Sequence, residues 1–120
     1  MNCIYVMIGG AIGALMRYGV SRLCAGVMLL TMPIGTLMVN LIGCFVLGLL
    51  TAFAEQHTAL PRGVMLMLTV GVCGAFTTFS TFSAESIKMM ENGHVFTALL
   101  YVTISIVMGF LLFFAGKQIP

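Results

Sequence analysis

The most informative stretch of the chain is residues 71–83, which read GVCGAFTTFSTFS. It lies within a long apolar segment, where an ordinary membrane helix would carry leucine and valine. Two glycines followed by hydroxyl residues predict a helix that is interrupted near the middle of the membrane. Released backbone carbonyls can hold a cation, and hydroxyl groups donate the hydrogen bonds that a dehydrated anion requires. The hydroxyl residues are Thr77, Thr78, Ser80, Thr81 and Ser83.

These hydroxyl groups also have a structural interpretation. A single Ser or Thr in a membrane helix usually bonds back to a carbonyl one turn earlier and only relaxes the helix. Five such residues within seven positions, 77–83, favour a polar pathway instead.

The composition of the whole chain places it in lipid. Of its 120 residues, 61% are hydrophobic and 7% are charged, and a water-soluble domain of this size would have an almost entirely apolar surface. Four apolar segments cover residues 3–20, 34–53, 63–90 and 95–115. Each is long enough for a membrane crossing, and the third is longer than one crossing needs. We therefore expect an all-α integral membrane protein, with residues 1–120 forming one four-helix transmembrane domain whose third helix is broken.

The distribution of basic residues bears on orientation and partners. The side with both termini and the second connection holds Arg62 and Lys117, whereas the opposite side holds Arg22, with Arg17 and Lys88 inside or near helix ends. Because the Lys/Arg bias sets orientation, this near balance predicts insertion in both directions and an antiparallel homodimer. A fixed orientation set by a few charges is the alternative that the count leaves open. The net charge of +2 is too dispersed to indicate nucleic-acid binding.

Aromatic residues accompany the hydroxyl residues of the third segment. Phe79 and Phe82 are three residues apart, so they lie on one helical face, and Phe76 continues the row. The positive edge of an aromatic ring can stabilise an anion without the full charge that would trap it. From these residues alone, packing against lipid or another helix is the more common role of such a row.

Polar residues recur in the second and fourth segments. Thr36 and Asn40 lie one turn apart on one face, and Tyr101 and Ser105 repeat this spacing. An unpaired amide in hydrocarbon is costly, so Asn40 must face a helix or water. It either joins two helices or donates to a polar track. Tyr101 and Ser105 would line the same track, unless each satisfies itself locally.

Three further features have mainly structural explanations. Gly9 and Gly13 form a GxxxG spacing, which allows another helix to approach closely. Arg17 lies near the end of the first segment and would ordinarily reach the headgroups, although it could instead form an electropositive vestibule wall. Glu85 and Lys88 are three apart and can pair with each other.

Three strings of the sequence resemble a known family. Residues 9–18 read GGAIGALMRY, residues 35–43 read GTLMVNLIG, and residues 74–85 read GAFTTFSTFSAE. They are similar to the Fluc (CrcB) fluoride channels, and the similarity extends over all four segments. The resemblance implies an antiparallel dual-topology homodimer with two fluoride pathways, located in a bacterial plasma membrane.

The resemblance also implies roles for individual residues. Phe79 and Phe82 would contact the permeating fluoride, Asn40 would be an amide donor, and Tyr101 with Ser105 would form a polar track. Carbonyl groups of Gly74 and Thr77 from both subunits would hold a structural sodium ion that is not transported. Where many members carry a second glycine and a leucine, this chain has Ala75 and Phe76. The remaining expected pathway residues are Thr36, Ser80 and Thr81, with Arg17 and Glu85 as vestibule residues.

The expected function is passive export of fluoride down its gradient. Fluoride is small and strongly hydrated, so a narrow path of closely placed donors must replace its water. The alternative is a small antiparallel proton-coupled multidrug exporter, which needs an acidic residue inside a span; the first span has none. An enzyme is not expected, because the only histidines, His57 and His94, lie in connections and no nucleophile and base converge.

Overall fold

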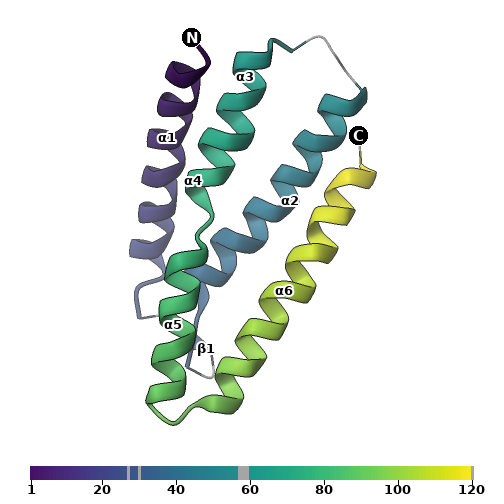
Figure 1. Ribbon diagram of the computed structural model, residues 1–120. Helices are drawn as coiled ribbons and strands as arrows, with labels where there is room; N and C mark the ends of the chain where they lie inside the picture. The colour runs from purple at the N-terminus through teal and green to yellow at the C-terminus, as the bar shows by residue number, and fades with distance from the viewer. Residues whose placement is uncertain (27, 30, 57–59, 120) are drawn as a thin grey trace.

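The computed structural model describes residues 1–26, 28–29, 31–56 and 60–119. Within these residues, four helical stretches are long and apolar enough to cross a membrane, as predicted. Three are the helices α1, α2 and α6, and the other is built from the shorter pieces α3, η1, α4 and α5 (Figure 1). Their bounds are Asn2–Leu23 for α1, Ile34–Gln56 for α2, Arg62–Leu66 for α3, Met67–Cys73 for η1, Gly74–Phe76 for α4, Phe79–Glu91 for α5 and Val95–Gln118 for α6.

The chain runs up and down through the bundle. The start of α1, the end of α2, the start of α3 and the end of α6 lie at one end of the bundle. The end of α1, the start of α2, the end of α5 and the start of α6 lie at the other end (Figure 1). We call these the terminal end and the connecting end. Arg62 begins α3 and Lys117 lies in the last turn of α6, which puts both toward the terminal end. Arg17 and Arg22 lie in the second half of α1 and Lys88 lies in the last turn of α5, which puts all three toward the connecting end. The structure thus keeps the near balance of basic residues that the sequence predicts.

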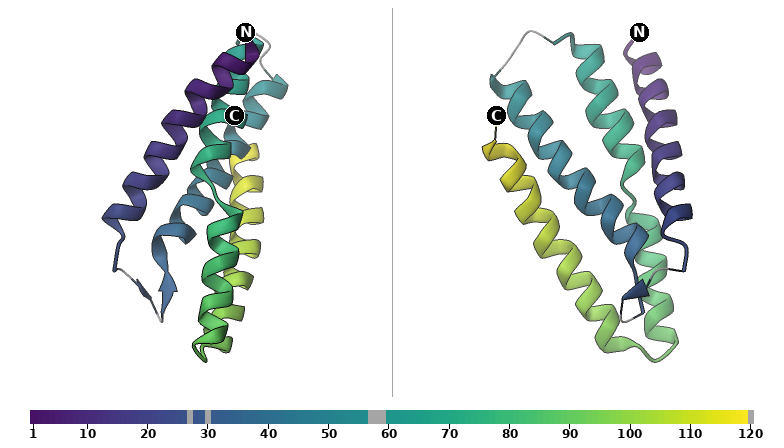
Figure 2. Two further views of the ribbon diagram at one scale, coloured as in Figure 1. Left: turned by 60° about the vertical axis from the view of Figure 1, so that its left-hand side comes forward. Right: turned by 180° about the vertical axis from the view of Figure 1, so that it is seen from behind.

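The helices associate as two close pairs. α1 packs along the third span and α2 along α6, as the right-hand view of Figure 2 shows, and α5 also contacts α6. Glycines make both pairs close: a Cβ on Gly9 or Gly13 would overlap a backbone carbonyl of η1, and one on Gly48 or Gly116 would overlap a carbonyl across the α2–α6 contact. The predicted packing role of Gly9 and Gly13 is confirmed, because small residues let membrane helices approach.

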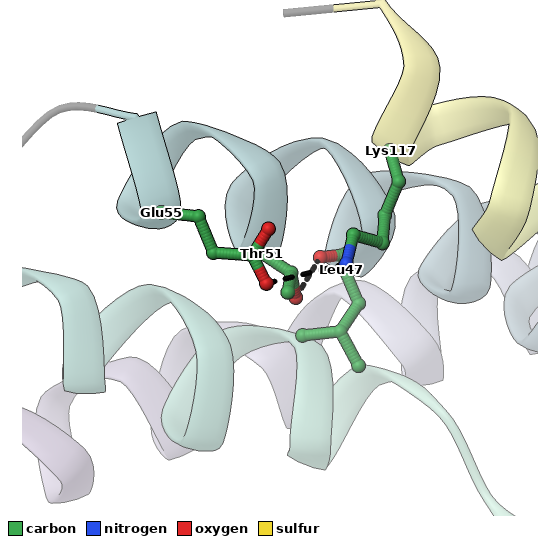
Figure 3. A network of polar contacts seen from close by, with 4 residues as sticks. All are labelled: Leu47, Thr51, Glu55 and Lys117. Atoms are coloured by element: carbon green, nitrogen blue, oxygen red, sulfur yellow. Dashed lines mark hydrogen bonds and ion pairs between the residues drawn. The ribbon is translucent and has the colours of Figure 1, made fainter.

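The ends of α2 and α6 are also joined by charge. Lys117 Nζ lies 3.2 Å from Glu55 Oε1, and the Thr51 hydroxyl donates to the Leu47 carbonyl at 2.7 Å on the same helix (Figure 3). Glu55 lies beyond the predicted apolar segment 34–53, but it still belongs to the last turn of α2. The apolar pattern marks only the part of a helix inside hydrocarbon, whereas backbone hydrogen bonding continues into its polar last turn.

Two further features of the first connection were not expected. Met28–Leu29 and Met32–Pro33 pair as the short antiparallel strands β1 and β2, and Thr31 between them has a φ of 68°. Pro33 therefore ends a strand, and α2 begins directly after it.

The two histidines are both predicted in connections. His94 lies in the α5–α6 connection as predicted, while His57 is outside the described residues.

The outer surface is apolar and the core is small. Large side chains such as Leu15, Phe96 and Phe114 are mostly exposed, and the two largest fully buried side chains are Tyr101 and Val39. A soluble protein rarely exposes apolar patches of this extent. Lipid or another protein surface must therefore cover these helices.

Candidate functional site

The third span is interrupted at Thr77 and Thr78. Both residues have extended backbone, with φ and ψ of −84° and 158° for Thr77 and −149° and 122° for Thr78. The predicted interruption is therefore confirmed, and it includes Thr77, one of the two residues whose carbonyls were expected at the break, but not Gly74. Gly74 is helical, at −63° and −39°, and the chain leaves the helix three residues later.

The glycines before the break have a different role. Gly71 faces α1, where a Cβ would meet the backbone of Gly9 and Gly10. It belongs to η1, a π-helical stretch in which the Gly74 N–H bonds to the Thr69 carbonyl five residues earlier. Ala75 has no positive φ, so this position needs no glycine for its backbone conformation.

Hydroxyl groups stabilise both sides of the break. Thr77 donates from its hydroxyl to the Cys73 carbonyl at 3.0 Å, one turn earlier. The Thr78 hydroxyl oxygen accepts from the Thr81 N–H at 3.2 Å, which caps the start of α5, and lies 3.3 Å from the Ser80 hydroxyl. Thr77 and Thr78 thus support the backbone locally, as the structural interpretation of such residues expects.

Asn40 on α2 binds the break through both halves of its amide. Its Nδ2 donates to the Thr78 carbonyl at 3.1 Å, and its Oδ1 accepts from the Thr78 N–H at 2.8 Å. The pair imitates the two hydrogen bonds between neighbouring strands. Asn40 therefore joins two helices, and since an amide nitrogen has two hydrogens, one N–H remains beyond this pair.

The hydrogen bonds at the break divert the donors of two carbonyl groups. In an unbroken helix the Gly74 carbonyl would accept from the Thr78 N–H, and the Thr77 carbonyl from the Thr81 N–H. Here those two N–H groups donate to Asn40 and to the Thr78 hydroxyl. Both carbonyls are thereby released, and carbonyl oxygens freed by a broken membrane helix suit a hard cation such as sodium. Among the described residues, no three His, Cys, Asp or Glu side chains group to hold a metal.

A groove of about 420 Å³ lies beside the break, and we call it the central groove. Its lining combines six predicted pathway or cation-site residues with the freed backbone. Ser105 contributes a buried hydroxyl oxygen that has no hydrogen-bond partner among the described residues. A buried polar atom without a partner is uncommon and calls for an explanation, such as an ion or water. The predicted residues in the groove are Asn40, Gly74, Thr77, Phe79, Phe82 and Ser105.

The two predicted aromatic residues line this groove differently. Phe79 is 79% exposed and Phe82 is 9% exposed, and their ring centroids are 5.8 Å apart at 47°. Phe82 continues the row to Tyr101, at 5.1 Å and 49°. Phe76 does not continue it, because the break lies between Phe76 and Phe79 and ends the helical spacing between them. Its ring lies close to Gly43 instead.

The other predicted residues lie outside the central groove. Thr36 and Glu85 line a cavity of about 700 Å³ toward the connecting end, together with Lys88 and His94. Ser80, Thr81 and Glu85 line a third hollow of about 320 Å³ on α5. Glu85 therefore belongs to both cavities, and its Oε1 accepts from the buried Tyr101 hydroxyl at 3.1 Å.

Arg17 lines none of these three cavities. It is half-buried, and its Nε donates to the Ala75 carbonyl at 3.1 Å. The sequence predicts Arg17 either at the headgroups or in a vestibule wall, and it does not predict this contact. Thr78 was likewise not singled out as a cap, although Thr is a favoured residue immediately before a helix.

The sequence of the chain matches a family model over residues 4–117, described as CrcB-like protein, Camphor Resistance (CrcB). The chain belongs to the CrcB family. Other CrcB proteins share much of its length: fluoride-specific ion channel FluC 1 of Staphylococcus aureus strain NCTC 8325 is 45% identical, covering 99% of this chain and 96% of the relative. Fluoride-specific ion channel FluC of Dehalococcoides mccartyi strain CBDB1 is 42% identical, covering 92% and 85%.

The family relationship and the helices together define the setting of the protein. These relatives are bacterial, they are named as ion channels rather than enzymes, and four described helical stretches of this chain can cross a membrane. This CrcB protein is therefore a multi-pass protein of a bacterial membrane.

Proposed function

We propose that the chain forms a fluoride channel that lets fluoride leave the cell down its own gradient. The observation that carries this proposal is the buried Ser105 hydroxyl, which has no hydrogen-bond partner within the described part of the chain. It lies in the groove that Asn40, Phe79 and Phe82 also line. A hydroxyl and an amide N–H donate to an anion, and ring edges stabilise it without a formal charge. The relatives named as fluoride-specific ion channels support fluoride as the anion that this chain conducts.

The lining of the central groove fits an ion that must bind and leave again. It contains no Lys, Arg, Asp or Glu among its described residues. A fixed positive charge would hold a small anion too tightly for rapid release, whereas hydroxyl, amide and ring-edge groups are individually weak. The flow is passive, and the protein catalyses no reaction.

We propose further that two copies insert in opposite directions and form an antiparallel homodimer. The near balance of basic residues between the two ends supports this arrangement. The distribution of the predicted pathway residues over three separate cavities of one chain supports it too, because a second copy is then needed to join them. Such a dimer would contain two fluoride pathways.

The released carbonyls of Gly74 and Thr77 support a structural sodium site at the centre of this dimer. Two carbonyl oxygens are few for a cation, and the same pair from an antiparallel partner would double them. Sodium bound there would hold the two broken helices together without being transported.

The competing exporter would use Glu85, the carboxylate closest to the pathway, as its proton carrier. That carboxylate accepts a hydrogen bond from Tyr101, and the named relatives are channels. Proton-dependent uptake of a cationic drug by purified protein would favour the exporter.

The test of the proposed function is fluoride efflux from proteoliposomes, followed with a fluoride-selective electrode. Protein-containing vesicles should release fluoride once a potassium ionophore balances the charge, and they should retain chloride under the same conditions. Vesicles that hold fluoride as tightly as protein-free ones would refute the channel. A tag at the C-terminus, probed from each side of the membrane, tests the dimer: it should be accessible from both sides, and access from one side only would refute dual topology.

A further inference from the structure

Arg17 on α1 forms a hydrogen bond to the helix next to the break. Neither the family relationship nor the lining of the central groove explains this contact. The Arg17 Nε donates to the Ala75 carbonyl at 3.1 Å across 58 positions of sequence. In an unbroken helix this carbonyl would accept from the Phe79 N–H, and the extended residues between them remove that donor. Arg17 thus replaces a hydrogen bond that the break has eliminated.

The position of Arg17 is set by the packing of α1. Gly9, Gly13 and Arg17 follow one another at intervals of four residues, so they lie on one face of α1. The two glycines meet the backbone of η1 so closely that a Cβ on either would overlap a carbonyl. Their contact holds α1 against the third span, and the next residue on that face, one turn further, reaches Ala75.

The two sides of the break are therefore held by different helices. Asn40 on α2 binds Thr78, directly before α5, and Arg17 on α1 binds Ala75, in the short helix α4. The positive charge of Arg17 also lies at the carboxyl end of a helical stretch, where the helix dipole is negative. Both contacts act on backbone groups, and neither side chain needs to meet an ion for this.

We propose that Arg17 is a positioning residue whose Nε–H fixes the end of α4, and with it the geometry of the helix break. This inference rests on the proposed channel function only in the efflux measurement, and the exchange measurement below does not depend on it. Without the contact, the Ala75 carbonyl lacks a partner and the last turn of α4 loosens. The Gly74 and Thr77 carbonyls and the first residues of α5 then lose their fixed relation to the central groove.

Three variants separate the hydrogen bond from the charge. Arg17→Gln places an amide N–H at the same distance along the side chain as Nε but has no charge. Arg17→Lys keeps the charge and has a carbon at that place, and Arg17→Met has neither. The loss of a hydrogen bond to a charged donor corresponds to about a tenfold or larger change. We expect Arg17→Gln to retain fluoride efflux within about threefold of the wild type, and Arg17→Lys and Arg17→Met to fall at least about tenfold.

Hydrogen–deuterium exchange measured by mass spectrometry provides a readout independent of flux. Backbone amides of residues 74–80 should exchange faster in Arg17→Met and Arg17→Lys than in the wild type, and Arg17→Gln should restore protection. If Arg17→Met fails to assemble on size exclusion, the comparison of Gln with Lys still decides. Wild-type protein that releases no fluoride would refute the channel function, but the exchange result would still test the role of Arg17. Flux and protection retained by Lys and lost by Gln would overturn the proposal in favour of a purely electrostatic role.

Discussion

Replacing Asn40 by alanine tests the connection between the helix break and conduction. The substitution removes both hydrogen bonds to Thr78, at 3.1 and 2.8 Å, and leaves the N–H and the carbonyl of that residue without these partners. A buried polar group left unpaired costs about 1–3 kcal/mol, so two of them cost about 2–6 kcal/mol. Water can enter the adjoining groove of about 420 Å³ and offset part of this cost. We therefore use the lower bound.

A cost of about 2 kcal/mol lowers the population of the native break about thirtyfold relative to alternatives. The variant also loses an amide donor that lines the groove, which lowers flux further. We expect fluoride efflux from proteoliposomes to fall at least about thirtyfold, while the protein still elutes as an assembled species on size exclusion. Asn2→Ala is the matched control, because Asn2 is exposed at the start of α1, and it should conduct like the wild type.

The variant Asn40→Asp separates the two roles of the amide. Aspartate keeps an oxygen acceptor for the Thr78 N–H but loses the Nδ2 donor and adds a negative charge that repels fluoride. We expect its flux to be no higher than that of Asn40→Ala. Efflux within about threefold of the wild type for Asn40→Ala, with assembly intact, would refute the reasoning. A higher flux for Asp than for Ala would show that Asn40 acts only on the backbone.

Three further changes test the groove, the helix contacts and the ion pair. Phe82→Ile removes the buried ring beside Tyr101 and should lower fluoride efflux at least about tenfold, whereas Phe96→Ile, outside the three cavities, should leave efflux unchanged; equal effects would remove the ring from the pathway. Gly116→Ala places a Cβ against an α2 carbonyl and should lower the free energy of unfolding by about 1–3 kcal/mol, while Gly19→Ala, which has open space, should not lower it. Lys117→Met should lower the free energy of unfolding by less than about 1 kcal/mol, because its ion pair with Glu55 is partly exposed. A larger loss would assign that pair a structural role.

Most of the fold could be predicted because the membrane imposes its own length scale. Every span needs about 20 apolar residues with internally paired backbone, so composition and segment length identify the four helices. The ends of the helices could not be predicted in this way, since Glu55 continues α2 beyond its apolar part and forms an ion pair with α6. The pattern of hydropathy does not record where backbone hydrogen bonding stops.

The existence of the break was predictable, but its position was predictable only in part. Glycines and hydroxyl residues at mid-membrane indicate an interruption, yet glycine serves equally for a bend and for close helix contact. In this chain Gly71 packs against α1 and Gly74 stays helical, while Thr77 and Thr78 leave the helix. The hydrogen bonds from Asn40 and from the Thr78 side chain favour the interruption at those residues, and these contacts are tertiary or depend on the cap geometry.

The sequence by itself determined that this chain crosses a membrane four times, that its third crossing is interrupted, and which residue types accompany the interruption. Hydropathy and helical spacing are local properties, because they depend only on residues that are close together in the sequence. The tertiary structure alone decided that Asn40 and Arg17 bind the two sides of the break, and that Thr36 and Ser80 lie in other cavities than Asn40. It also decided that the Ser105 hydroxyl has no partner among the residues that the structure describes. These contacts join residues far apart in the chain, and their partners depend on how closely glycines let the helices approach.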